Sequence, residues 1–146
     1  SAVLSARLIR EAVESDLARL TATLRPPAIL DAMQAEIGLQ HQADRADDVN
    51  AFIESDDRFH RLLAEAAGHE AVWNDLERLK SQMNRLRHMS MWVFDRAQTI
   101  AQHQDILDAV QRGDAEAADR AARVHLHQML TELPLMAARH PEYFTE

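Results

Sequence analysis

Four polar side chains stand at positions where helical spacing predicts core residues, and their types are those that bind divalent cations. Asp56 and His60 are four residues apart, so a helix places them on one face, one turn from each other. His103 and His125 interrupt the apolar stripes of two later segments. Three neutral imidazoles and one carboxylate suit Zn²⁺, Ni²⁺, Mn²⁺ or Fe²⁺, and two or more coordination positions would stay open for water or a ligand.

The spacing of His103 and His125 predicts that the two imidazoles lie at the same level of a helical hairpin. The pair Gly113-Asp114 is typical of a helix stop followed by a helix cap. His103 lies ten residues before Gly113 and His125 twelve residues after it, or roughly 15 Å and roughly 17 Å of helix. Two other interpretations fit the same residues: hydrogen-bonded core histidines, and a plain ion pair between the acid and its neighbouring imidazole.

The composition favours a single helical domain and argues against direct contact with nucleic acid. The 146 residues include only three glycines and four prolines, and the formal net charge is −8. A surface of that sign repels phosphate backbones. The absence of cysteine excludes disulfides and thiolate metal sites. No apolar run approaches the roughly 20 residues that span a bilayer, so we expect a cytoplasmic protein without membrane contact.

Apolar residues at helical spacing predict an all-α fold, an antiparallel bundle of about six helices with the cation site at its centre. Pro26-Pro27 ends the first helix because proline lacks the amide proton and clashes with the preceding turn. Ile9 and Leu24 of that helix are at core spacing. We expect a bend at 92–94 and an irregular tail over 140–144. The predicted helices cover about 3–24, 27–45, 49–67, 70–89, 96–112 and 115–138.

Three segments together resemble a known family. Residues 56–60 (DDRFH), followed by an Ala-Gly step at 67–68, resemble the D-x-x-F-H signature of the FCD domain, the C-terminal half of FadR-branch GntR transcription regulators. Residues 103–114 with His125-Leu126 are similar to its hairpin, and residues 10–14 (REAVE) to its first helix. The resemblance covers essentially the whole chain.

The resemblance implies a metal-containing, effector-binding and dimerisation domain spanning residues 1–146, whose N-terminal winged helix-turn-helix domain is absent from this chain. In that family an Asp and three His hold a divalent metal, and they match Asp56, His60, His103 and His125. We expect zinc, with nickel, manganese or iron as alternatives. The implied function is sensing of a small organic acid or sugar acid, which controls DNA binding by the missing domain.

The resemblance also suggests residues that contact the effector. The first-helix arginine of the family matches Arg10, and Arg85 and Arg87 lie on the predicted fourth helix, where basic contacts to effector are common in the family. His127 lies two residues beyond the last predicted ligand, at reach of the cavity edge. Gln102 stands where the family has Glu before the third ligand, so the orientation of His103 is expected to differ.

The expected partners are a small carboxylate effector, a second copy of the chain in a homodimer, and operator DNA through the missing domain alone. Two other classes of function remain open. An open metal can activate water, as in a metalloenzyme with a His₃Asp site, although no general base is evident near the ligands. A plain helical interaction module with a histidine-rich core is the other.

Overall fold

The computed structural model describes residues 2–81 and 95–143, and both ranges are almost entirely helical. No strand occurs in either range, which confirms the predicted all-α fold. The tail is not wholly irregular, because three of its residues form a 3₁₀ turn. The elements are α1 (Ala2–Leu24), α2 (Pro27–Arg45), α3 (Val49–Ala66), α4 (Glu70–Ser81), α6 (Arg96–Gln111), α7 (Ala115–Arg139) and η1 (Pro141–Tyr143).

The helix ends follow local signals in the sequence. The side chains of Asp48 and Asp114 each accept a hydrogen bond of 3.0 Å from the backbone N–H three residues later, which caps α3 and α7. Gly68 and Gly113 adopt positive φ values of 78° and 71° just after α3 and α6. The predicted end of the fourth helix and the bend at 92–94 lie outside the described residues.

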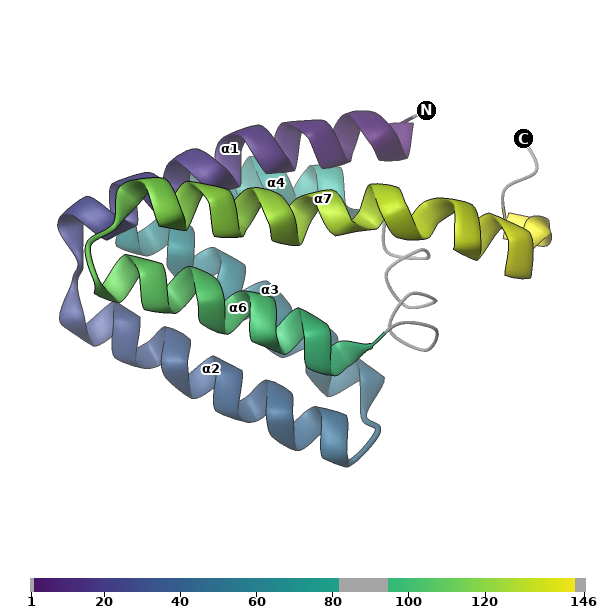
Figure 1. The fold of residues 1–146 in the computed structure, drawn as a ribbon, viewed down its shortest axis with the longest axis horizontal. Helices are drawn as coiled ribbons and strands as arrows, with labels where there is room; N and C mark the ends of the chain where they lie inside the picture. The colour runs from purple at the N-terminus through teal and green to yellow at the C-terminus, as the bar shows by residue number, and fades with distance from the viewer. Residues whose placement is uncertain (1, 82–94, 144–146) are drawn as a thin grey trace.

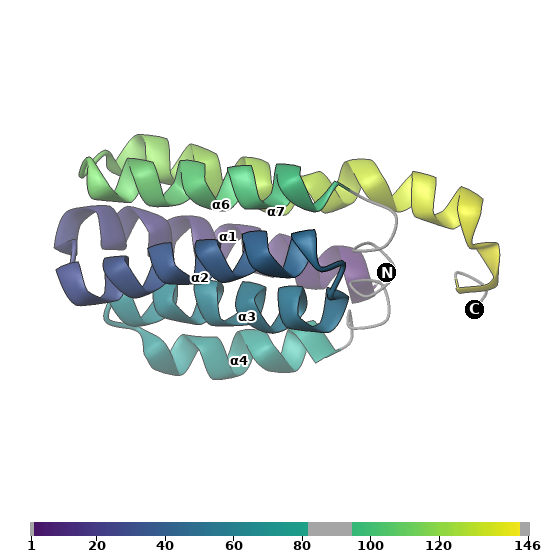
Figure 2. The same ribbon diagram turned by 90° about the horizontal axis from the view of Figure 1, so that it is seen from below.

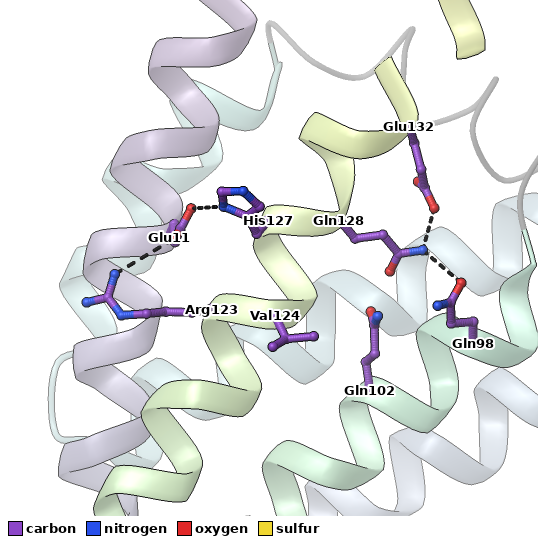
Figure 3. A pocket seen from close by; sticks show the side chains of 8 residues that line it. All are labelled: Glu11, Gln98, Gln102, Arg123, Val124, His127, Gln128 and Glu132. Carbon is purple, nitrogen blue, oxygen red and sulfur yellow. Dashed lines mark hydrogen bonds and ion pairs between the residues drawn. The ribbon is translucent and has the colours of Figure 1, made fainter. Parts of the chain in front are cut away.

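The helices pack as an antiparallel bundle. Figure 2 shows α6 and α7 on one side, α1 and α2 in the middle, and α3 with α4 on the other side. In Figure 1 the last turns of α7 extend beyond the ends of the other helices. A surface groove lies between α1, α6 and α7 (Figure 3). No helix in the described residues combines the length and apolarity needed to cross a membrane.

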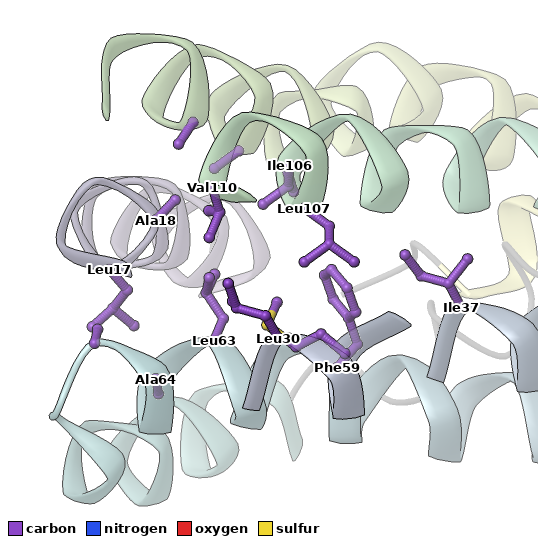
Figure 4. Close-up of a cluster of buried hydrophobic side chains, with 14 of the residues drawn as sticks. Leu17, Ala18, Leu30, Ile37, Phe59, Leu63, Ala64, Ile106, Leu107 and Val110 are labelled. Atoms are coloured by element: carbon purple, nitrogen blue, oxygen red, sulfur yellow. The ribbon is translucent and has the colours of Figure 1, made fainter. Parts of the chain in front are cut away.

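The hydrophobic core fills the space between α1, α2, α3 and the α6–α7 hairpin (Figure 4). The largest buried side chains of its centre include Phe59 of α3 and Leu107 of α6. The predicted core face of α1 is wrong at both ends, because Ile9 and Leu24 are 42% and 59% exposed. Leu17, between these two positions, is buried as predicted, and the other buried residues of α1 are small or polar: Ala6, Arg10, Glu14, Ser15, Ala18, Thr21 and Ala22.

Candidate metal centre

Asp56, His60, His103 and His125 converge where α3, α6 and α7 meet, and one ligand atom from each lies within 4.8 Å of the other three. Nε2 of His125 is 3.2 Å from Nε2 of His103 and 3.3 Å from Nε2 of His60. Oδ1 of Asp56 is 3.2 Å from Nε2 of His103 and 3.3 Å from Nε2 of His60. Atoms about 2.1 Å from one cation are about 3.0–3.4 Å apart in octahedral or tetrahedral geometry, so this cluster could hold one metal ion.

The outer nitrogen of each imidazole bonds to an oxygen, and this fixes which nitrogen carries the hydrogen. His60 Nδ1 lies 2.5 Å from Oε1 of Glu14 on α1. His103 Nδ1 lies 2.7 Å from the side-chain oxygen of Gln40 on α2, and His125 Nδ1 lies 2.9 Å from that of Gln102 on α6. Because these oxygens accept, each Nδ1 donates. When the rings are neutral, the three Nε2 lone pairs therefore face one another, an arrangement that a bound cation stabilises.

Burial and neighbouring charges act differently on the three imidazoles. Burial lowers the pKa of His60, but the carboxylates of Glu14 and Asp56 outweigh it, so the pKa of His60 is raised. Burial lowers the pKa of His103, and it lowers the pKa of His125 strongly, with a further contribution from the other two rings. The last two imidazoles are thus kept in the neutral form, which is the form that binds metal.

Glu14 joins the cluster to Arg10 of the same helix. Its side chain is 1% exposed, and its Oε2 accepts a hydrogen bond of 2.8 Å from Nε of Arg10. Burial by itself raises the pKa of Glu14, but the positive charge of Arg10 and the contact with His60 hold that pKa well below its ordinary value. The carboxylate is therefore ionised and bridges an arginine and a candidate ligand.

Gln102, whose side-chain oxygen accepts from Nδ1 of His125, also lines the groove between α1, α6 and α7 (Figure 3). The volume of this groove is about 530 Å³, Arg10 is not among its lining residues, and seven of the eight residues that line it have polar side chains. It is lined by Glu11, Gln98, Gln102, Arg123, Val124, His127, Gln128 and Glu132.

The predicted effector residues are distributed unevenly around the cluster. Arg10 is buried, at 5% exposed, and contacts the cluster through Glu14. The side chain of His127 is 57% exposed and lies in the groove, where its Nδ1 is 3.3 Å from Oε2 of Glu11. Arg85 and Arg87 lie outside the described residues.

Comparison with known proteins identifies the family. The FCD domain matches residues 7–128 of the sequence, which is most of the chain. The chain belongs to the FCD domain family. This confirms the resemblance seen in the sequence motifs.

Relatives of this FCD domain are named as transcriptional regulators. It is 30% identical over 139 residues to the HTH-type transcriptional repressor RspR of Escherichia coli strain K12, covering 94% of this chain and 61% of the repressor. It is 33% identical over 144 residues to an HTH-type transcriptional regulator in an unstable DNA locus of Streptomyces ambofaciens, covering 97% and 60%. It is 30% identical over 117 residues to the galactonate operon transcriptional repressor of E. coli K12, covering 78% and 50%.

These relatives decide between the classes of function that the sequence left open. The FCD domain is a regulatory domain and these relatives are named as transcriptional regulators, so the expected regulatory class is confirmed and the metalloenzyme is not. The chain spans between half and about three fifths of the length of the three relatives.

The residues around the cluster were less predictable than the cluster itself. Glu14 and Gln40 were not singled out. Gln40 follows Met33 and Ile37 on the apolar stripe of α2 and could have been found by the rule that identified the histidines, whereas Glu14 lies off the apolar stripe of α1. Gln102 was expected to orient His103, its neighbour in sequence. It contacts His125 across the hairpin instead, because consecutive residues of a helix point in different directions.

Proposed function

We propose that this FCD domain binds a small organic acid at a divalent cation and thereby controls DNA binding by the whole regulator. The cation, for which zinc is the first candidate, would be held by Asp56, His60, His103 and His125. The carrying observation is that three Nε2 atoms and one carboxylate oxygen converge while every Nδ1 is tied to an oxygen. A cation there supplies positive charge and open positions for a carboxylate.

Arg10 is proposed as the second contact of the effector. Only its Nε is used by Glu14, and within the described residues its terminal nitrogens have no hydrogen-bond partner. A planar guanidinium suits a carboxylate. Arg85, Arg87 and His127 remain proposed contacts, as expected from the sequence. Because the chain is negatively charged, an anion must be attracted by this local positive charge.

A hydroxy acid of the aldonate type is the proposed class of effector. One relative is named as a repressor of a galactonate operon, and galactonate carries a carboxylate beside a hydroxyl group. Such a pair of oxygens can occupy two adjacent positions of a cation. Neutral sugars of the same size lack the charge that the cation and Arg10 would recognise.

Calorimetry with D-galactonate and with uncharged D-galactose tests this function, using zinc-loaded and chelated protein. We expect galactonate to bind more tightly than galactose, and only with zinc. Arg10→Ala should weaken galactonate binding by about 2–5 kcal/mol, the usual loss when one partner of a buried charge pair is removed. Arg120→Ala, which removes an exposed arginine of α7, is the control. Equal affinity for both compounds, or affinity unchanged by chelation, would contradict the proposal.

The remaining steps concern the whole regulator. We propose that the missing part of the protein carries a winged helix-turn-helix domain, that two copies pair, and that the regulator acts on operator DNA in the cytoplasm. An effector that binds two packings of the helices with different affinity shifts the balance between them. That shift would change how the paired DNA-binding domains sit on the operator.

A further inference from the structure

Glu14 has two positively polarised partners and a single negative charge to share between them. Oε1 accepts from His60 Nδ1 at 2.5 Å, and Oε2 accepts from Arg10 Nε at 2.8 Å. All three side chains are buried. Charges act strongly on each other in such surroundings because little water screens them.

The other two imidazoles have neutral outer partners. His103 and His125 donate to the amide oxygens of Gln40 and Gln102, which carry no net charge. Among the three Nδ1 contacts in the described residues, only that of His60 is made to a charged side chain, Glu14. Glu14 in turn pairs with a second charged group. That group is Arg10, the arginine proposed to receive the effector.

We propose that Glu14 is a counter-ion shared by Arg10 and the cation site, and that it couples the binding of the cation to the binding of an anion. A cation at His60 Nε2 makes Nδ1–H a stronger donor and draws the carboxylate toward the ring. More of the positive charge of Arg10 is then left for an anion. This inference rests on the proposed function, since it requires a cation in the cluster.

Thermodynamic linkage makes the coupling reciprocal. An anion that neutralises Arg10 must raise the affinity of the cation by the same factor by which the cation raises the affinity of the anion. Removing the charge of Arg10 should imitate the anion. Glu14 is a positioning residue in this scheme, because it acts through His60 and Arg10 and not on the effector itself.

Zinc affinity alone, measured by chelator competition without any effector, tests the coupling in a double-mutant cycle. We expect Arg10→Met to raise zinc affinity about fivefold or more. Glu14→Gln should lower it about 10- to 100-fold, because the substitution removes the negative charge and replaces one of the two acceptor oxygens by an NH₂ group that donates. In the Glu14→Gln background, Arg10→Met should leave zinc affinity unchanged.

Direct repulsion between Arg10 and the cation predicts a different pattern. Arg10→Met would then raise zinc affinity equally in both backgrounds, which would overturn the proposal. Arg10→Lys, which keeps the charge, should bind zinc like the unaltered chain, and so should Glu77→Gln, which removes an exposed carboxylate of α4. If circular dichroism shows that Arg10→Met is unfolded, unchanged zinc affinity in Glu14→Gln still overturns the proposal.

The outcome also separates this inference from the proposed function. Failure of the unaltered chain to bind zinc would refute both. Zinc binding at one ion per chain with additive effects of the two substitutions would refute the shared counter-ion alone.

Discussion

Replacing His103 by alanine should remove zinc-dependent stability from this domain. The His103 ring is completely buried, and it stacks on Phe59 with a centroid distance of 4.5 Å. Its Nε2 faces Asp56 and His125 at 3.2 Å in both cases. His103→Ala therefore deletes one of four candidate ligands at the centre of the cluster and leaves the other three without their shared neighbour.

The magnitude follows from linkage and from the contacts of the ring. Zinc at a hundredfold excess over its dissociation constant stabilises a folded protein by about 2.7 kcal/mol. For a domain of this size that corresponds to a rise in Tm of roughly 10 °C. His103→Ala should reduce the zinc-dependent rise to nearly zero. The zinc-free variant should also lose about 1–3 kcal/mol, because the buried oxygen of Gln40 loses its donor.

Thermal melts with zinc and with chelator measure both effects, and metal analysis of the purified protein gives the stoichiometry. His41→Ala is the matched control, because His41 is an exposed histidine of α2 away from the cluster. It should keep one zinc per chain and the full rise in Tm. The reasoning is refuted if His103→Ala keeps the zinc-dependent rise, or if His41→Ala loses it.

Three further predictions concern pH and two glycines. In zinc-free protein the free energy of unfolding should fall as pH drops below about 6.5. His103 and His125 have lowered pKa values in the folded state, so they bind protons more readily in the unfolded chain. His60, whose pKa is raised in the folded state, opposes this effect in part. Urea titrations at several pH values measure it, and rising stability on acidification would contradict it. Gly113→Ala should cost about 1–2 kcal/mol, since φ is +71° and an added Cβ would lie 3.2 Å from a guanidinium group. Gly38→Ala, in open space within α2, should gain about 0.5–1 kcal/mol in the same titrations.

The helices and the four converging side chains could be predicted because their signals are local or periodic. Pro26 lies between α1 and α2, Pro27 is the first residue of α2, and Gly113-Asp114 lies between α6 and α7. The convergence of His103 and His125 needed only the rise per residue of a helix and the position of that turn. Asp56 and His60 needed only helical spacing.

The buried face of α1 was harder to predict because hydrophobicity is a poor guide to it. The stripe containing Ile9 and Leu24 is the more apolar one, yet both side chains are exposed. The helix is rotated so that Arg10 and Glu14 face the bundle, where their mutual ion pair and the contact with His60 offset the cost of burial. Contacts between side chains distant in sequence decide this rotation, and the spacing within one helix does not reveal them.

The origin of the four ligands on three helices has a consequence for folding. An unfolded chain offers a cation only the neighbouring pair Asp56 and His60, whereas His103 and His125 become ligands after the α6–α7 hairpin has docked on α3. The complete site thus forms only when contacts of long sequence separation are in place, and cation binding would follow assembly of the bundle. A bound cation would then link α3, α6 and α7 and close the long loops between them, as a disulfide bond does in proteins that contain cysteine.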